Sequence, residues 1–372
     1  MRKSRNPPAT GGRLRSRLRR NRHREVSFRG NPLPRAAAIA VLALALASCG
    51  GGGKSGSGTT GEQTATGGGK QIVAALVSDI GKFNDHGFNQ SQLAGLNRAK
   101  AELGVKGIAL QSNSESDYIP NLTSAVRQHA DIVIAAGFLL ANSVKTMAKK
   151  FPDTHFAITD QSYKDAGGFK NVQGLTYAAN ESGCLVGVLA AKMAERMGNK
   201  VIGAVMGVKI PPVDIWTAGY RYCAQKAVPG TKVLMGYSND FVATDNCKTV
   251  AEQQLSQGAE VLFQVAGGCG LGTLKAADQA GKWGIGVDVD QYNLAHRVLT
   301  SAVKRVDIGV YNAIKQVQEG KWNGGHDLVF DLKNGGMGLG RINPAVPPSD
   351  IRLMSRYKAE IIAGKLKVPS TL

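Results

Sequence analysis

The feature that most constrains this chain is the regular alternation of apolar runs and helical stretches that begins after Lys70. Continuous apolar runs are typical of strands buried on both faces, and the segments between them are long enough for helices. We expect strands at 72–78, 107–112, 131–137 and 154–160. Strands that alternate with helices in this way predict an α/β fold with a doubly wound parallel sheet.

The alternation starts again after residue 200. The expected strands are 201–207, 233–237, 260–266, 285–288 and 298–303, and the expected helices are 213–227, 246–257, 271–280, 307–319 and 350–365. Two similar units favour two lobes over one large sheet. The predicted N-terminal lobe is 71–178 plus about 303–330, and the predicted C-terminal lobe is 179–302 plus about 331–372.

The N-terminal segment has the pattern of an export signal. Residues 36–47 form a 12-residue apolar run, which is too short to span a bilayer, behind a strongly basic stretch. The sequence Leu46-Ala47-Ser48-Cys49 that follows resembles a bacterial lipobox, in which the cysteine receives a lipid anchor. We therefore expect residues 1–48 to be a lipoprotein signal peptide and Cys49 to be lipidated. The alternative is a short buried helix with a chance cysteine.

Glycine and charge describe the remaining organisation. Half of residues 50–69 are glycine, so residues 49–70 are expected to form a flexible tether. The net charge is +19, but residues 1–48 carry +11 of it, so we expect no nucleic-acid-binding face on the body. No apolar stretch of about 18 residues occurs, which excludes a multi-span membrane protein. The expected location is the extracytoplasmic face of the cell membrane, through the lipid.

Candidate ligand-binding residues follow the predicted strands. In open parallel sheets, ligands bind beyond the carboxyl ends of strands, and two facing units would form a cleft there. The candidates at these positions are Asn84, Asp85, Phe88, Asp160, Gly268 and Asp288. Phe88 can equally be a core residue, and Asn84 and Asp85 can serve only to cap a helix. For Asp288, the alternatives are a helix cap or an ion pair with Lys304.

Five motifs, in order and spacing, resemble the basic membrane lipoprotein family. They are Asp79-x-Gly81…Asp85-x-x-Phe88-Asn89-Gln90, Trp216-x-x-Gly219-Tyr220, Ala266-Gly267-Gly268-x-Gly270, Gly286-Val287-Asp288-x-Asp290-Gln291 and Ser301-x-Val303-Lys304-Arg305-Val306-Asp307. The likeness runs from about residue 72 to residue 365. It implies a two-lobed type I periplasmic-binding-protein fold with three crossovers between the lobes.

The resemblance also implies a function. Family members include purine-nucleoside receptors that deliver their ligand to an ABC permease and its ATPase. They stack the base between two aromatic rings, here Phe88 and Trp216, the latter where the family usually has phenylalanine. Packing of Trp216 against the adjacent sheet is the alternative. Strand-end carboxylates and a lysine correspond to Asp160, Asp288 and Lys304. We expect Asp85 and Asp160 at the polar edge of the base, and Asp288 with Lys304 at the ribose.

No catalytic constellation stands out. The chain lacks HExxH, CxxC and P-loop patterns, so we expect no enzyme activity, no cofactor and no metal. We also expect the protein to be a monomer. Gly268 belongs to a glycine-rich turn that allows backbone amides to approach a sugar or base. The alternatives are a sugar-type or other small-molecule receptor or sensor of the same fold, and a nucleoside-processing enzyme. Asp288-Val289-Asp290 is the nearest match to the acidic cluster of such an enzyme.

Four cysteines lie in the body, and outside the cytoplasm they are free to oxidise. If the second sheet has strand order 2-1-3-4, the helices after its second and third strands share one face. Cys247 and Cys269 lie near the starts of these two helices, whereas Cys184 and Cys223 lie on helices of the other face. We therefore predict the disulfides Cys184–Cys223 and Cys247–Cys269. Four buried free thiols are the alternative.

Overall fold

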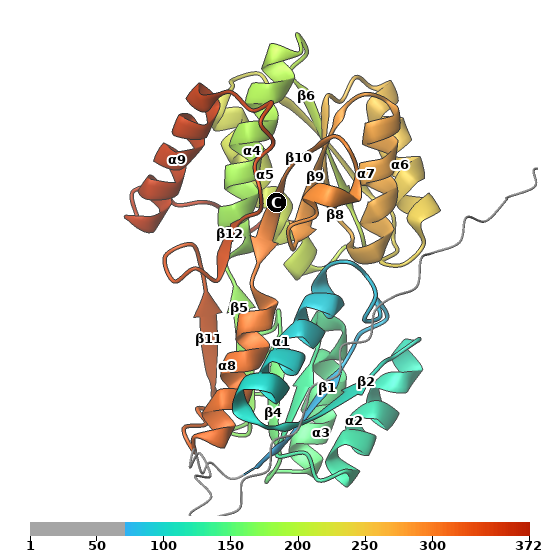
Figure 1. Ribbon diagram of the computed structural model, residues 1–372, viewed down its shortest axis with the longest axis vertical. Helices are drawn as coiled ribbons and strands as arrows, with labels where there is room; N and C mark the ends of the chain where they lie inside the picture. Colours follow the sequence, from blue (N-terminus) through green and yellow to red (C-terminus); the bar gives the residue numbers. More distant parts are fainter. Residues whose placement is uncertain (1–70) are drawn as a thin grey trace, which may run out of the picture. The chain divides into compact units, whose positions relative to one another are not determined.

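The computed structural model describes residues 71–372, which form two six-stranded sheets with helices on both faces (Figure 1). The expected signal peptide, the lipidated Cys49 and the tether lie outside the described residues. Among residues 71–372, none of the helices combines the length and apolar character that a membrane-spanning helix needs.

The first sheet has the order β11-β5-β4-β3-β1-β2, and all its strands are parallel. Its strands are β1 (Val73–Val77), β2 (Lys106–Leu110), β3 (Ile132–Ala135), β4 (His155–Thr159), β5 (Val172–Tyr177) and β11 (His326–Phe330). Its helices are α1 (Phe88–Leu103), α2 (Tyr118–Arg127), α3 (Ala141–Lys150) and α8 (Val306–Gln318). We call this sheet and its helices the N-terminal lobe.

The second sheet has the matching order β12-β10-β9-β8-β6-β7, with only β12 antiparallel. Its strands are β6 (Val201–Met206), β7 (Lys232–Tyr237), β8 (Val261–Val265), β9 (Trp283–Asp288), β10 (Val298–Lys304) and β12 (Met337–Leu339). Its helices are α4 (Ala179–Arg196), α5 (Pro211–Ala227), α6 (Thr244–Ser256), α7 (Leu271–Gln279) and α9 (Pro348–Ile362). We call this sheet and its helices the C-terminal lobe.

The chain passes between the sheets three times, after β5, after β10 and between β11 and β12. The central strands β1, β3, β4 and β8 are almost completely buried, as their apolar runs predict. The predicted α/β class with two doubly wound parallel sheets is therefore confirmed. Strand β10 ends at Lys304, close to the expected lobe boundary at about 303.

Three strands were absent from the sequence prediction. Strand β5 is buried, but Gln173, Gly174 and Thr176 interrupt its apolar run. Strand β11 begins with His326 and Asp327 at a sheet edge, and β12 has only three residues. Strands β11 and β12 pair with strands from which other elements separate them in the chain, which no local pattern reveals.

Two disulfides lie in the C-terminal lobe. Cys184 on α4 is joined to Cys223 on α5, with the Cα atoms 4.9 Å apart. Cys247 on α6 is joined to Cys269 in the short 3₁₀ turn Gly267–Gly270, with the Cα atoms 5.6 Å apart. These are the pairs expected from the strand order 2-1-3-4, which the second sheet has as β7-β6-β8-β9.

Candidate functional site

A pocket that is partly open to solvent lies where strand ends of both sheets meet. Six of the expected ligand-binding residues line it: Asp85, Phe88, Asp160, Trp216, Asp288 and Lys304. The other two do not. Asn84 is exposed on the loop before α1, and Gly268 lies beside the pocket, where an added Cβ would stand 3.6 Å from the Cα of Asp85.

A buried lysine sits at the centre of this arrangement. The Nζ of Lys304, at the end of β10, is 2.6 Å from Asp160 Oδ2 and 3.5 Å from Asp288 Oδ1. All three side chains are at most 10% exposed. Burial opposes the charge of the lysine, but the two carboxylates outweigh burial and raise the pKa of Lys304 above its usual range. The lysine is therefore a cation in the folded protein.

The two carboxylates occupy equivalent places in the two lobes. Asp160 follows β4 and Asp288 ends β9, the fourth strand of each lobe. Both have positive φ, 61° and 65°, a conformation that aspartate tolerates better than most residues. Burial raises the pKa of Asp288 to about 6, although Lys304 acts in the opposite direction.

The two expected aromatic rings both face the lysine. Its Nζ is 4.6 Å from the centroid of the Phe88 ring and 5.5 Å from that of the Trp216 ring. Phe88 is the first residue of α1 and is partly exposed, whereas Trp216 on α5 is 1% exposed. Trp216 also packs edge-on against Phe263, with the ring centroids 6.3 Å apart. Trp216 thus lines the pocket and contacts the core at once.

Close backbone packing positions Trp216. Helices α4 and α5 approach so tightly that a Cβ at Gly183 would collide with the carbonyl oxygen of Trp216. The same holds for Gly187 against Tyr220 and for Gly219 against Asn180. Glycine is required at these positions because any side chain would push the helices apart. The close packing of α4 against α5 therefore holds the backbone of Trp216 in place.

Asp85 acts as the cap of α1. Its two carboxylate oxygens accept hydrogen bonds from the backbone nitrogens of Gly87, Asn89 and Gln90, at 2.8 to 3.0 Å. The side chain of Asn89 donates a fourth, at 3.2 Å. Burial raises the pKa of Asp85 despite these donors. Asp85 therefore caps the helix in the structure, and a contact between Asp85 and a ligand stays a prediction.

Of the other residues that line the pocket, which the sequence argument did not select, three are Asp79, Asn89 and Phe241. Asp79 and Asn89 stand in the first motif, so the strand-end rule applied to that whole motif would have found them. Phe241 lies in the loop after β7, outside every motif, and has no sequence signal.

Asp79 presents a carboxylate oxygen to the pocket. Its Oδ1 accepts hydrogen bonds from the backbone of Gly81 at 2.8 Å and from Asn89 Nδ2 at 2.7 Å. Its Oδ2 lies near Gly137, where a Cβ would stand 3.4 Å from that oxygen and 3.1 Å from the Phe88 ring. Gly137 has a φ of 115°, so both its conformation and the space favour glycine. Burial raises the pKa of Asp79 to about 6.

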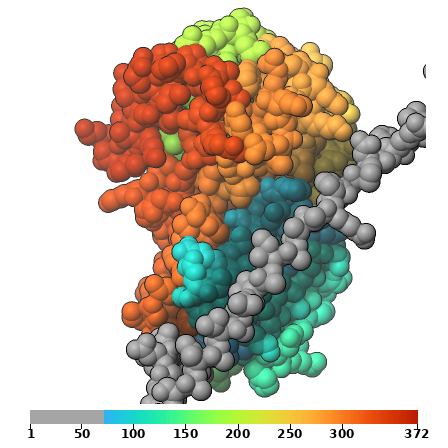
Figure 2. Space-filling view, viewed as in Figure 1, coloured from blue at the N-terminus to red at the C-terminus, as the bar shows by residue number. Residues whose placement is uncertain are grey.

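The lobes also contact each other beside the pocket. The buried side chain of Gln291 donates a hydrogen bond of 3.0 Å to the backbone oxygen of His86 in the N-terminal lobe. Gln264 donates to the Oε1 of Gln291 at 2.7 Å and so fixes its orientation. In Figure 2 the blue loop that precedes α1 lies directly against orange segments of the C-terminal lobe. The two lobes are therefore in contact beside the pocket.

The arrangement can hold a small molecule that is flat on one part and polar on another. Two aromatic rings, one from each lobe, lie near a lysine that contacts two carboxylates. Within residues 71–372, no group of three side chains is placed to ligate a metal ion.

The sequence matches a family model described as "ABC transporter substrate-binding protein PnrA-like" over residues 72–371. The chain belongs to this family. The resemblance found in the sequence is thus confirmed, and the PnrA-like family consists of substrate-binding proteins of ABC transporters rather than enzymes.

Individual relatives agree with the family. The chain is 35% identical to the "ABC transporter nucleoside-binding protein BmpA" of Lactococcus lactis, over 80% of this chain and 89% of the relative. It is 33% identical to an uncharacterized lipoprotein of Pyrococcus horikoshii, over 80% of this chain and 74% of the relative. The crystal structure of a solute-binding protein from Aeropyrum pernix K1 superposes with a TM-score of 0.73 at 27% identity. It covers 80% of this chain and 94% of that protein.

Proposed function

We propose that this protein is a lipid-anchored extracytoplasmic receptor that binds a nucleoside, with a purine base, between its lobes and delivers it to an ABC permease and ATPase. The observation that carries the proposal is that Phe88 and Trp216, one from each lobe, both line the pocket, with their ring centroids 4.6 Å and 5.5 Å from the Nζ of Lys304. Binding is reversible and involves no chemical step.

The aromatic rings suit a planar base. Stacking on an aromatic side chain contributes roughly 1–3 kcal/mol per base, so two rings supply a large share of a micromolar affinity of about 8 kcal/mol. Because the rings come from different lobes, a base between them holds the lobes together. Trp216 keeps a π face where the family usually has phenylalanine and enlarges it, so the substitution bears on the base preference rather than on nucleoside binding itself.

The polar edge of the base is assigned to the N-terminal lobe. Asp79 Oδ2 is an acceptor beside Phe88, and the buried Asn89 Oδ1 has no hydrogen-bond partner among the described residues. Two acceptors favour a base edge that donates, such as the N1–H of hypoxanthine or guanine. Asp85 and Asp160 remain candidates for the same edge.

The ribose is assigned to the C-terminal lobe. A carboxylate at the end of a parallel strand is well placed to accept hydrogen bonds from vicinal hydroxyls. Asp288 has this position, and Lys304 supplies a donor next to it. Replacing Asp288 by alanine is expected to weaken nucleoside binding by roughly 1–3 kcal/mol, because ribose hydroxyls lose their acceptor.

The anchor and the transport partners follow from the leader and the family. Cys49 after its apolar run is the proposed site of lipidation, and a relative from Pyrococcus horikoshii is named a lipoprotein. Membership of a family of ABC transporter substrate-binding proteins supports delivery to a permease. Labelled fatty acid should enter the wild-type protein and not the Cys49→Ala variant, and incorporation into that variant would contradict the lipobox interpretation.

Calorimetry and fluorescence test the ligand. Guanosine, inosine or adenosine should release or absorb heat on titration and should change the fluorescence of Trp216. The Trp216→Phe variant keeps a stacking face and should bind while losing most of the fluorescence change. Ribose alone should bind poorly, since it has no surface to stack. Tight binding of a free sugar with no response to any nucleoside would replace the proposal by a sugar receptor.

A further inference from the structure

Gln291 is buried at the lobe boundary but lies outside the ligand pocket. It follows β9 in the C-terminal lobe and is 1% exposed. It lines a neighbouring groove together with His86 and Gly87 of the N-terminal lobe, and it is not among the residues that line the ligand pocket. The role of this side chain is therefore to be sought in its contacts with the protein itself.

Two donors fix the direction in which the amide of Gln291 points. Its Oε1 accepts hydrogen bonds from the backbone nitrogen of Val287 at 3.1 Å and from Gln264 Nε2 at 2.7 Å. A backbone N–H can only donate, so the amide oxygen must face Val287 and the Nε2 must face the other way. The Nε2 donates to the carbonyl oxygen of His86, which can only accept, at 3.0 Å. Both polar atoms of the amide thus have partners of the right kind.

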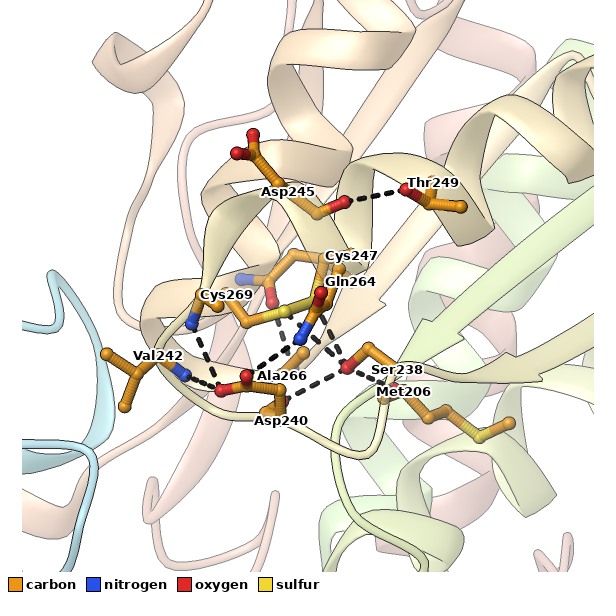
Figure 3. Close-up of a disulfide and its surroundings, with 12 residues drawn as sticks. Met206, Ser238, Asp240, Val242, Asp245, Cys247, Thr249, Gln264, Ala266 and Cys269 are labelled. Carbon is orange, nitrogen blue, oxygen red and sulfur yellow. Dashed lines mark hydrogen bonds between the residues drawn. A yellow bond between two sulfur atoms is a disulfide. The ribbon is translucent and has the colours of Figure 1, made fainter.

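The second glutamine, Gln264, is held in the same manner. Its Oε1 accepts a hydrogen bond of 3.1 Å from the backbone nitrogen of Ala266, which lines the ligand pocket. Figure 3 shows both residues beside the disulfide Cys247–Cys269. A chain of hydrogen bonds therefore runs from Ala266 through Gln264 and Gln291 to the N-terminal lobe.

Two glycines leave room for these side chains. A Cβ at Gly270 would collide with the side chain of Gln264, and a Cβ at Gly286 would collide with Ser301 Oγ and Gln291 Oε1. The Oγ of Ser301 also accepts a hydrogen bond of 3.0 Å from the backbone nitrogen of Gln291. Gly270, Gly286, Gln291 and Ser301 all stand in the five sequence motifs, and none of them lines the ligand pocket. The packing of the two glutamines thus accounts for motif positions that ligand contact does not explain.

The acceptor of the crossing bond lies in the loop that leads into α1. His86 has a φ of 52°, and its own backbone nitrogen donates to Gln90 Oε1 at 3.2 Å. The preceding residue, Asp85, caps α1, and Phe88, two residues after His86, lines the pocket. A hydrogen bond to the carbonyl of His86 therefore holds the backbone between the cap and the aromatic ring.

We propose that Gln291 is a positioning residue that holds the lobes in the closed arrangement, with or without a ligand, and so sets how long a ligand stays in the pocket without touching it. The inference rests on the proposed function for the identity of that ligand. When the lobes separate, water can hydrate the carbonyl of His86. When they close, that carbonyl needs the donor of Gln291, because a buried acceptor without a donor is costly. Loss of the donor therefore disfavours the closed arrangement.

The first experiment compares two buried glutamines of the same lobe. Gln291→Met should release guanosine or inosine about 5- to 50-fold faster, as expected when one hydrogen bond is lost and a buried acceptor is left unpaired. The association rate should hardly change, because affinity changes within one site are mostly changes in dissociation. Gln254→Met is the matched control. Gln254 is 4% exposed and donates to the carbonyl oxygen of Ala204 at 2.9 Å, within the C-terminal lobe.

The control should release the ligand within about twofold of the wild-type rate, because its lost bond does not cross between the lobes. Urea unfolding of both variants shows whether the loss of a buried amide has destabilised them to a similar extent. Equal dissociation rates in the two variants would overturn the positioning role of Gln291.

Gln291→Asn keeps the experiment decisive if the methionine variant does not fold. Asparagine retains an amide but is one methylene shorter, so it cannot reach Val287 and His86 together. It should also release the ligand faster, and a wild-type rate would overturn the proposal. In both variants the ratio of the affinities for guanosine and inosine should stay within about twofold of the wild-type ratio, because each twofold change corresponds to only a small part of one hydrogen bond. A larger change would mean that Gln291 contacts the base, which also overturns the positioning role.

Small-angle X-ray scattering of the ligand-free protein separates this inference from the proposed function. The radius of gyration should be larger for Gln291→Met than for the wild type and unchanged for Gln254→Met, because only the first variant loses a bond between the lobes. If the wild-type protein binds no nucleoside, the proposed function fails, yet this comparison still decides whether Gln291 holds the lobes together. Equal radii for the three proteins would overturn the inference whatever the ligand is.

Discussion

The two lobes have the same strand order but different side chains at equivalent strand ends. Strands β4 and β9 both lead to an aspartate with positive φ, Asp160 and Asp288. Strands β5 and β10 occupy the next place in each sheet, and they end at Tyr177 and Lys304. The lysine lies 5.6 Å from the centroid of the tyrosine ring. The shared strand order therefore brings the carboxylates of Asp160 and Asp288 together. The lobes differ at the neighbouring strand, where Lys304 of the C-terminal lobe supplies one cation that contacts both carboxylates.

This difference makes the site depend on both lobes. The contact between Lys304 and Asp288 lies within the C-terminal lobe, whereas the shorter contact with Asp160 crosses to the N-terminal lobe. A charge pair that crosses the boundary exists only when the lobes are together. We therefore predict that the pair of Lys304 and Asp160 stabilises the contact between the lobes. The pair of Lys304 and Asp288 should mainly fix the positions of side chains in the site.

Removal of Lys304 should have the largest effect on stability, because this lysine contacts the aspartates of both lobes. Lys304→Met keeps a long unbranched side chain, one atom shorter than lysine, but removes the cation that contacts two buried carboxylates. Removing one partner of a buried ion pair typically costs about 3–5 kcal/mol, so the free energy of unfolding in urea should fall by that amount at pH 7. A loss below about 1 kcal/mol would show that water already screens these carboxylates. The matched Lys315→Met change on the exposed face of α8 should have little effect.

Replacing each aspartate in turn sharpens the contrast between the lobes. Asp160→Asn should lower the free energy of unfolding by about 1–3 kcal/mol, because it removes the closer partner of Lys304. Asp288→Asn should change it by less than about 1 kcal/mol, since the carboxylate that it removes is itself costly to ionise in this place. Urea unfolding of the two variants at pH 7 measures both values. The opposite order would contradict the assignment of the crossing pair as the stronger one.

The sequence predicted the plan of the site better than its details. Strand-end placement brought Asp160 and Asp288 to the pocket, and the resemblance added Trp216 and Lys304. Phe241 was missed because a short polar loop has no periodicity that marks one of its residues as facing inward. The edge strands β11 and β12 were missed for a related reason, since their pairing partners lie far away in the sequence.

A pH test concerns Asp79, a buried carboxylate for which no ion pair is found among residues 71–372. Asp79 lies just after β1 and has a pKa of about 6 in the folded protein, raised by burial, against 3.8 as its ordinary value. Its contribution to stability is therefore present at low pH and is lost as the pH rises through 6. An asparagine in place of Asp79 would accept the same hydrogen bonds from Gly81 and Asn89 without a charge.

The stability of Asp79→Asn relative to wild type should thus increase by about 1–2 kcal/mol between pH 5 and pH 8. Urea unfolding of both proteins across this range gives the difference, in which the other titrating groups cancel. The change Asp153→Asn at an exposed position serves as a control for the loss of a carboxylate outside the pocket. A constant difference for Asp79→Asn would mean that Asp79 ionises as it does in the unfolded chain.

The smallest change in the free energy of unfolding is expected at Tyr177, which ends β5 at the place where Lys304 ends β10 in the other lobe. The ring of Tyr177 stacks on Phe330, with centroids 4.8 Å apart, and its buried hydroxyl has no hydrogen-bond partner among the described residues. Tyr177→Phe keeps the ring and its contact with Lys304 and removes only that hydroxyl. The free energy of unfolding should therefore stay the same or rise by up to about 1 kcal/mol. Tyr177→Leu, which loses the stacked ring, should instead be destabilised. If Tyr177→Phe were destabilised as strongly as Tyr177→Leu, the hydroxyl would have a partner, such as a buried water, and the contrast between a charged and an apolar strand end would have to be revised.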